Sequence, residues 1–380
     1  MRLANALNRI LSNQMVPGII LISAALLAMI ISNSSLSPVY FSIINSKTPV
    51  NVLFIVNDVL MTIFFLDIGL EIKHQMITGH LSKPKQIFLP IAAAMGGVIM
   101  PALIFICLNR HDILALHGWA IPTATDIAFA LGVITLLSGR ISLELKILLM
   151  AIAVIDDLIA ILIIAIFYTT NISILFCILS SLTIAMLCLM NIYNVKKIIH
   201  YLMVGALLWF FMFHSGVHVT ICGVIVALAI PMSTRQVIHK QLYIWVAYFV
   251  LPIFAITNAG ISLEGITLSQ LYQPVPLGIA LGLICGKQLG VFSFAWISVK
   301  LKIALLPKEI PWNHLYGMAI LCGIGFTMSI FIGNLSYSNM STAYMAGNKL
   351  GVLIGSTFSA ISGYLFLRYV SRYNVYLKLK

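Results

Sequence analysis

Residues 153–159 read Ala-Val-Ile-Asp-Asp-Leu-Ile, and they place two adjacent carboxylates, Asp156 and Asp157, inside an apolar run without a basic residue. An ionised side chain at the bilayer centre costs about 2.5–3.5 kcal/mol even on the gentler scales, so acids at this depth are functional by default. Adjacent helix residues point about 100° apart, because a helix has 3.6 residues per turn. One aspartate can therefore face an ion cavity while the other meets a partner. The alternative is a structural pair locked by hydrogen bonds, although such a role would rarely need two carboxylates.

The composition of the whole chain indicates a membrane environment for this run. Of the 380 residues, 61% are hydrophobic and 8% are charged, whereas soluble domains are usually about 25% charged. Lipid must be the solvent for most of such a chain. We expect an all-α polytopic membrane protein with a single transporter domain over residues 1–380. The net charge of +12 does not indicate nucleic acid binding, because the basic residues are spread singly between apolar runs.

We identify twelve candidate spans, since a helix needs about 20 apolar residues to cross the hydrocarbon core. They centre near Ala25, Ile63, Gly97, Ala130, Asp156, Leu182, Leu207, Val224, Pro252, Gly286, Gly323 and Ser356. The seventh and eighth are short and nearly fused around residues 214–216. If both termini are cytoplasmic, 18 of the 22 Lys and Arg residues fall in cytoplasmic segments, and only Lys47, Arg110 and Lys349 fall outside. This asymmetry follows the positive-inside rule and favours an even number of spans.

Two of these spans carry helix breakers near their middles. Residues 121–126 read Ile-Pro-Thr-Ala-Thr-Asp, and residues 322–327 read Cys-Gly-Ile-Gly-Phe-Thr. Proline removes a backbone donor, and paired glycines weaken a helix. Two kinked helices would explain the pattern, but it also predicts unwound fourth and eleventh spans whose freed backbone groups line a site. Each break lies in the middle of a three-span group, as expected for inverted repeats.

Further polar residues inside the spans complete the candidate site. Besides the aspartate pair, four acids lie in or at the ends of apolar spans: Asp58, Asp67, Glu71 and Asp126. Lys287 lies deep in the tenth span, where it must pair with a carboxylate or lose its proton. Because broken helices expose partial charges at their ends, Asp126 and Lys287 are predicted to offset them. Thr125 adds a hydroxyl beside the first break.

These groups favour exchange of a small hard cation for protons. Carboxylate, hydroxyl and carbonyl oxygens suit such a cation, and a carboxylate buried among apolar groups also holds a proton. Competition for the same acids gives antiport if the site faces each side in turn. The alternatives are an intramembrane aspartyl protease, a channel and a sodium-coupled solute symporter. Adjacent aspartates do not fit the facing dyad of a protease, channel filters are usually carbonyl or charge rings, and neither a zinc motif nor a cofactor signature is found.

Six stretches form a specific pattern that runs over nearly the whole chain. They are 69–73 (Gly-Leu-Glu-Ile-Lys), 118–132 (Gly-Trp-Ala-Ile-Pro-Thr-Ala-Thr-Asp-Ile-Ala-Phe-Ala-Leu-Gly), 155–158 (Ile-Asp-Asp-Leu), 216–218 (Gly-Val-His), 245–248 (Trp-Val-Ala-Tyr) and 322–330 (Cys-Gly-Ile-Gly-Phe-Thr-Met-Ser-Ile). This pattern resembles the NhaA family of bacterial sodium/proton antiporters, itself a known example of inverted repeats. The resemblance implies twelve helices in the bacterial inner membrane. It also implies electrogenic export of sodium or lithium in exchange for protons, which regulates intracellular pH and sodium.

The resemblance further implies roles for single residues. Asp157 would be a principal ligand of protons and of transiently bound sodium or lithium, and Asp156 would pair with Lys287 and gate the cavity. Asp126 and Thr125 would shape the site at the break. The cavity and the pH response would involve Asp58, Glu71, His218 and Gly325.

Four departures from the family pattern concern the dimer and the pH response. Residues 34–50 are too short for the full β-hairpin that joins the family's dimer, so a homodimer would have a shortened contact. Residues 239–243 read His-Lys-Gln-Leu-Tyr without the acid that often lies there, and Gln75 stands where another acid is common. Asp67 stands at a position expected to be apolar. We predict a surface charge near the cytoplasmic mouth, and the alternative is an added proton relay. Together these departures predict a pH profile between pH 6 and 9 that differs from the usual steep alkaline activation.

Overall fold

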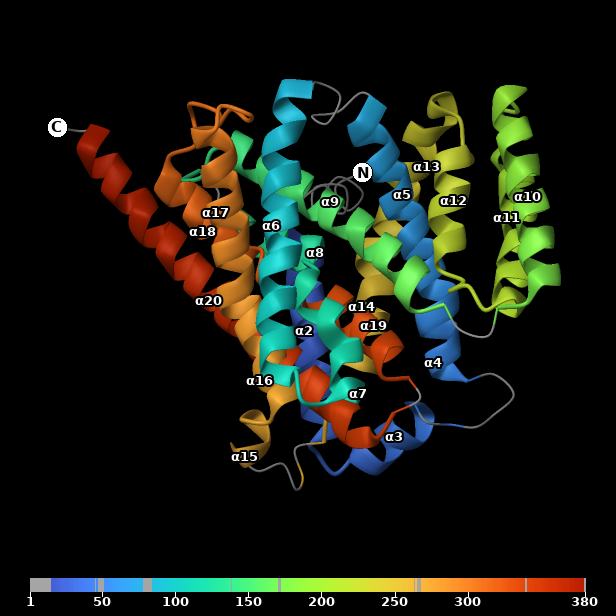
Figure 1. The fold of residues 1–380 in the computed structure, drawn as a ribbon, viewed down its shortest axis with the longest axis horizontal. Helices are drawn as coiled ribbons and strands as arrows, with labels where there is room; N and C mark the ends of the chain where they lie inside the picture. The colour runs from blue at the N-terminus through green and yellow to red at the C-terminus, as the bar shows by residue number, and fades with distance from the viewer. Residues whose placement is uncertain are drawn as a thin grey trace, which may run out of the picture.

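The computed structural model of the chain consists of helices that follow the apolar stretches of the sequence (Figure 1). It describes residues 15–44, 46, 51–77, 84–137, 139–169, 172–262, 264, 268–338 and 340–378. No strand occurs in these ranges. The prediction of an all-α membrane protein is therefore confirmed.

The helices of the first half of the chain end with α10. They are α2 (Met15–Ser32), α3 (Ser37–Ile44), α4 (Val52–Phe54), the π-helix η1 (Ile55–Leu60), α5 (Met61–Ile77), α6 (Pro84–Asn109), α7 (Ile113–Leu116), the 3₁₀-helix η3 (His117–Thr123), α8 (Ile127–Thr135), α9 (Leu143–Phe167) and α10 (Ile174–Ile192). The stretch 34–50, expected to be too short for a full β-hairpin, contains helix α3 and no strand in its described part.

The helices of the second half begin with α11. They are α11 (Ile198–Ser215), α12 (Ile221–Ala229), α13 (Met232–Trp245), the π-helix η4 (Val246–Val250), α14 (Leu251–Asn258), α15 (Leu268–Leu271), α16 (Pro274–Leu281), the π-helix η5 (Gly282–Gly286), α17 (Lys287–Lys300), α18 (Trp312–Leu321), α19 (Phe326–Ser336) and α20 (Thr342–Lys378). Short π-helical turns often mark functional sites. Here η1 contains Asp58, and η5 ends immediately before Lys287.

The predicted count of twelve membrane spans is only partly matched by the described helices. Eight helices in the described ranges are long and apolar enough to cross a membrane, and three bent pairs bring the number up to eleven. The count of twelve is therefore not confirmed. The eighth predicted span, near Val224, is α12, which has nine residues and thus a length of about 14 Å, less than half of the roughly 30 Å hydrocarbon core. Its C-terminal end is held by the Lys73 ammonium, which donates to the carbonyls of Leu228 and Ile230 at 2.7 and 2.6 Å.

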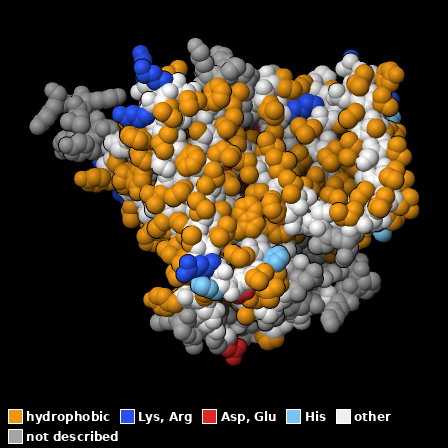
Figure 2. All heavy atoms as spheres, viewed as in Figure 1, with side chains coloured by type: hydrophobic (Ala, Val, Ile, Leu, Met, Phe, Trp, Pro, Cys, Tyr) orange, Lys and Arg blue, Asp and Glu red, His pale blue; other side chains and the backbone are white. Residues whose placement is uncertain are grey.

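Two hydrophobic cores join the helices. The larger core includes buried side chains of α2, α5, α6, α8, α9 and α19, and the smaller core is formed mainly by α11 and α12. In Figure 1, α20 runs diagonally along the left flank, and α10 and α11 stand at the right edge. Figure 2 shows that hydrophobic side chains dominate the visible outer face. An apolar exterior is what a lipid-facing surface requires, and it leaves the polar groups of the spans to the interior.

Candidate ion-exchange site

The two interrupted spans contact each other at their breaks. The bend is 42° between η3 and α8 and 44° between α18 and α19, so the predicted interruptions of the fourth and eleventh spans are confirmed. The Asp126 N–H donates to the Ile324 carbonyl at 2.6 Å, and the Ser329 hydroxyl donates to the Ile121 carbonyl at 2.7 Å. Each broken span thus donates a hydrogen bond to a backbone carbonyl of the other span that the helix break has left without a helical partner. Irregular backbone at membrane depth survives only with such cover.

Asp126 caps the first turn of two helices. It is the N-cap residue of α8, where its Oδ1 accepts from the Phe129 N–H at 2.9 Å. Its Oδ2 accepts from the N–H and the hydroxyl of Thr327, in the first turn of α19, at 3.1 and 2.5 Å. Helix N-termini carry a partial positive charge. Two positive helix ends therefore converge on one carboxylate that is only 2% exposed.

Gly325 is the N-cap residue of α19 and lies at a point where the chain is crowded. Its N–H and that of Phe326 donate to the Ser356 hydroxyl of α20 at 3.2 and 3.0 Å. A Cβ at Gly325 would clash with the Ser329 hydroxyl one turn later, and it would also lie 3.0 Å from the Leu283 side chain and 3.1 Å from the Ala124 carbonyl oxygen. The glycine therefore allows the two breaks to approach closely.

Asp156 on α9 is held by an ion pair. Its Oδ2 lies 2.5 Å from Lys287 Nζ, and both side chains are fully buried. The Thr125 hydroxyl lies 2.7 Å from the same oxygen and 2.9 Å from the Cys322 carbonyl, and its single proton can serve one acceptor at a time. In the described part of the chain, Lys287 thus donates to Asp156 rather than to a helix C-terminus.

Asp157, the next residue, has no hydrogen bond or ion pair within the described ranges. Its side chain is 1% exposed, and its buried Oδ1 lacks a partner. The negative charges of Asp156 and Asp126 repel it, and the charge of Lys287 attracts it. Neighbouring residues on a helix point about 100° apart, so Asp156 can face Lys287 while Asp157 faces a different direction and has no partner among the described residues. An ionised carboxylate left in this state is costly unless a cation or a proton occupies it.

Two other predicted residues, Asp58 and His218, lie together away from this pair. His218 Nε2 is 3.7 Å from Asp58 Oδ1, and His218 Nδ1 is 2.8 Å from the Thr220 hydroxyl. The His218 ring packs edge-on against Phe331 of α19, with the ring centroids 5.8 Å apart. Phe331 therefore links this second polar location to the interrupted eleventh span.

The third location is a cluster between α5 and α13, formed by Asp67, Glu71, Arg235 and His239 and called the mouth cluster below. Glu71 accepts from Arg235 at 2.9 Å, lies 3.3 Å from His239 Nε2 and accepts from the Gln75 amide at 2.6 Å. Asp67 Oδ1 lies 3.5 Å from the same histidine nitrogen. Asp67 is only 7% exposed, so the prediction of a surface charge was wrong. One helical turn separates Asp67 from Glu71, which turns both acids toward α13.

Sequence reasoning assigned no role to three residues that hold these sites together. Thr327 lies in the first turn after a predicted break, which is a signal for a capping partner. Arg235 was counted only as a cytoplasmic base, yet it is 4% exposed and also donates to the Leu70 carbonyl. Ser356 lies within an apolar span, and no motif around it in the sequence indicates that its hydroxyl accepts hydrogen bonds from the first turn of α19.

Comparison with known proteins identifies relatives over most of the chain. Residues 8–367 match the family described as Na+/H+ antiporter 1. The Na(+)/H(+) antiporter NhaA of Pseudomonas putida (strain GB-1) is 46% identical over 371 residues, which cover 93% of this chain and 95% of the relative. The Na(+)/H(+) antiporter NhaA of Sulfurovum sp. (strain NBC37-1) is 47% identical over 379 residues, which cover 94% and 96%. The Na(+)/H(+) antiporter NhaA 1 of Pseudomonas savastanoi pv. phaseolicola is 48% identical over 371 residues, which cover 95% of each chain.

Proposed function

The chain belongs to the Na+/H+ antiporter 1 family, and starting from this membership we propose how its buried acids exchange the two ions. The protein is a sodium/proton antiporter of the membrane and not an enzyme. The relatives give no support to the protease or to the solute symporter considered above. We treat residues 1–380 as one transport domain.

The unpartnered carboxylate of Asp157 carries the proposal. A buried anion without a partner is unstable in apolar surroundings, and either a proton or a sodium ion removes that cost. The two substrates therefore compete for one group. No cluster of three or more His, Cys, Asp or Glu side chains suited to a metal occurs in the described ranges. A transient sodium or lithium site would thus combine Asp157 with Asp156 and with neutral oxygens such as that of Thr125.

Asp156 and Lys287 act as the gate of this site in our proposal. Lys287 satisfies Asp156 at 2.5 Å, and we assign this arrangement to the state in which Asp157 holds a proton. An arriving cation competes with Lys287 for Asp156, since both are positive ligands of the same carboxylate. The site therefore has two arrangements, one held by the lysine and one held by the cation. Two such arrangements allow the site to open to one side of the membrane with a proton bound and to the other side with sodium bound.

Asp126 fixes the wall of the site rather than the transported ion. It already accepts three hydrogen bonds from two helix N-termini. A carboxylate engaged in this way has little capacity left for a cation. We infer that it keeps the two breaks in register, with Gly325 allowing their close approach, while α8 and α19 move between the inward and outward states.

Several finer properties belong to the same proposal. Transport would be electrogenic, would accept lithium as well as sodium, and would export sodium from a bacterial cytoplasm. Both termini would lie on the cytoplasmic side of the inner membrane, as the distribution of Lys and Arg favours. A homodimer would need a contact other than a full β-hairpin, because residues 37–44 form helix α3. Bilayer lipid would cover the apolar exterior.

The pH response is proposed to depend on the mouth cluster and on the Asp58–His218 pair. In the mouth cluster the acids near His239 are Glu71 and Asp67, and both come from α5 and not from α13. Its charges are therefore arranged differently from those that the family pattern led us to expect. We propose that the activity profile between pH 6 and 9 departs from steep alkaline activation. A profile with that steep rise would contradict this part of the proposal.

The experiment that tests the role of Asp157 follows proton movement in everted membrane vesicles. Respiration builds a pH gradient that a fluorescent amine reports, and sodium, lithium or potassium is then added. We expect sodium and lithium to collapse the gradient with the parent and not with Asp157→Asn. Asp112→Asn is the matched control, because Asp112 lies in a loop and caps α7. Exchange retained in Asp157→Asn would overturn the assignment, and exchange lost in both variants would show that the loss is not specific to the site.

A further inference from the structure

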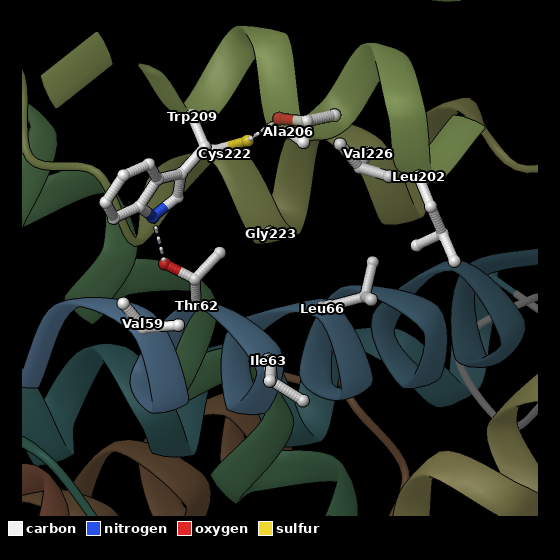
Figure 3. A pocket seen from close by; sticks show the side chains of 11 residues that line it. Val59, Thr62, Ile63, Leu66, Leu202, Ala206, Trp209, Cys222, Gly223 and Val226 are labelled. Atoms are coloured by element: carbon white, nitrogen blue, oxygen red, sulfur yellow. Dashed lines mark hydrogen bonds between the residues drawn. The ribbon is translucent and has the colours of Figure 1, made fainter. Parts of the chain in front are cut away.

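A cavity of about 330 Å³ lies between α5, α11 and α12, and its lining residues do not come from the interrupted spans (Figure 3). One wall comes from η1 and α5, and it includes Thr62 and Leu66. The other wall comes from α11 and α12, and it includes Ala206, Trp209 and Val226. None of the residues that line the cavity takes part in the exchange site. The cavity therefore needs an explanation of its own.

The polar atoms that line this cavity are already satisfied by the protein. The Thr62 hydroxyl donates to the Asp58 carbonyl at 2.5 Å and accepts from the Trp209 indole N–H at 3.2 Å. The Cys222 thiol donates to the Gly205 carbonyl at 3.3 Å. The other lining side chains are apolar. A water molecule needs two to four polar partners and so does not fill such a space, whereas apolar molecules do.

The mouth of the cavity opens on a flank with an apolar exterior. Leu202, which lines it, is 43% exposed, and Ala206 one turn later is also exposed. Their neighbours on the outer side of α11, Met203 and Leu207, are 64% and 45% exposed. In a membrane-spanning helix this face meets hydrocarbon. The cavity is thus open to lipid and closed to polar solutes.

We propose that this cavity binds an acyl chain of a membrane phospholipid. An engineered apolar cavity of about 150 Å³ accommodates benzene, so a space about twice as large accommodates roughly twelve carbon atoms of a chain. The occupant fills the space beside the points where these helices already pack closely, since a Cβ added at Gly205 would lie 2.9 Å from Val226 and one added at Gly223 would meet the backbone of Thr62. It also packs beside Thr62, which is bonded to the π-helical turn that carries Asp58.

Trp209 provides a direct test because it lines the cavity. The other four tryptophans, Trp119, Trp245, Trp296 and Trp312, are replaced by phenylalanine in the full-length protein. A phosphatidylglycerol with a dibrominated acyl chain is titrated into the detergent-solubilised protein. Bromine quenches indole fluorescence on contact. We expect saturable quenching at a low ratio of lipid to protein.

Two variants distinguish the cavity from general lipid contact. Ala206→Phe fills the mouth and is expected to weaken the apparent lipid affinity at least fivefold, whereas Leu207→Phe, on the adjacent outer face, leaves it unchanged. If Ala206→Phe does not fold, Leu202→Phe one turn earlier replaces it. Added phospholipid should also raise the unfolding temperature of the parent more than that of the filled variant. Quenching that rises linearly with lipid in all variants, or that is absent from the parent, would overturn the proposal.

Discussion

The buried centre and the mouth cluster both gather acidic residues, but they satisfy them differently. At the centre, Asp157 has no partner in the described structure, and its neighbour Asp156 depends on Lys287 alone for positive charge. In the mouth cluster, Glu71 accepts from Arg235 and also lies near His239, which in turn lies near a second acid. At the centre, each acid thus has at most one positively charged partner. In the mouth cluster, two acids share His239, and one of them also pairs with Arg235.

In our proposal this difference separates a centre that binds and releases ions from a cluster whose charges compensate one another. A carboxylate with no fixed partner is free to take a proton or a cation, and a single ion pair has only two states. Shared partners distribute charge, so the loss of one member leaves the others compensated. At the centre, the loss of one partner strands a buried charge, which costs about 3–5 kcal/mol. The two regions should consequently respond to substitution on different scales.

The largest effect is expected from Lys287→Gln. This change removes the charge that neutralises Asp156 at 2.5 Å, and the free energy of unfolding should fall by about 3–5 kcal/mol. Thermal unfolding in detergent measures it. Lys300→Gln is the matched control, because Lys300 ends the same helix α17, is exposed and has its Nζ over the Trp296 ring, 5.4 Å from the ring centroid.

A second variant separates charge from shape at this position. Adding Asp156→Asn to Lys287→Gln removes the stranded anion, so most of the lost stability should return while exchange stays absent. A double variant as unstable as Lys287→Gln would show that packing, and not the buried charge, is responsible.

The second effect concerns the double cap at Asp126. Asp126→Ala removes the acceptor of both the Phe129 and the Thr327 N–H groups, and at about 0.5–2 kcal/mol per cap the protein should lose about 1–4 kcal/mol. Asp126→Asn keeps one carbonyl oxygen for α8 but turns an amide toward the Thr327 donors. Its loss should be intermediate in the same thermal unfolding measurement. Equal losses for both variants would contradict the assignment of two separate caps.

The sequence predicted the centre better than the mouth cluster, and the reason is physical. Buried charge in apolar runs is costly wherever it occurs, so Asp156, Asp157 and Lys287 were identifiable without knowledge of their neighbours. Helix breakers act locally, so both interruptions were also predicted. The partners of Asp67 and Arg235 depend on how α5 packs against α13, more than 160 positions apart, and no local pattern encodes that contact.

The eighth predicted span stays unconfirmed for a related reason. Hydropathy near Val224 indicated a crossing, but the nine residues of α12 end where Lys73 of another helix holds the final carbonyls. The end of α12 is thus fixed by a tertiary contact that hydropathy does not register.

A smaller effect is expected from Asp67→Leu in the mouth cluster. Glu71 remains to meet His239 and Arg235, so maximal exchange should stay within about twofold. Stability should stay within about 1 kcal/mol, because the large cost of about 3–5 kcal/mol arises only where a buried charge is left without a partner. The dependence of exchange on pH is the property expected to change. Vesicle assays from pH 6 to 9 measure both, with Glu71→Gln as the contrasting loss of the shared acceptor. An inactive Asp67→Leu would place Asp67 with the centre as an essential carboxylate.

The smallest effect is expected at Asp112, a partly exposed carboxylate in a loop. It shows how much a single hydrogen bond to an acid outside the spans contributes to stability. The Tyr344 hydroxyl, at 2.6 Å, and then the N–H groups of Ala115 and Leu114 hold the pKa of Asp112 below its usual value. A depressed pKa in the folded state adds stability that is present above the unfolded value of about 3.9 and is lost as the pH falls through the folded value.

Tyr344→Phe should therefore lower the free energy of unfolding by about 0.5 kcal/mol at pH 7, a small value because solvent screens the bond. The difference in stability between the variant and the parent should shrink below about pH 4. Unfolding temperatures from pH 3 to 7 measure it, with Tyr316→Phe, which loses a neutral bond to Gln288, as a control without this pH dependence. A difference that grows on acidification would show that Tyr344 does not stabilise the ionised carboxylate.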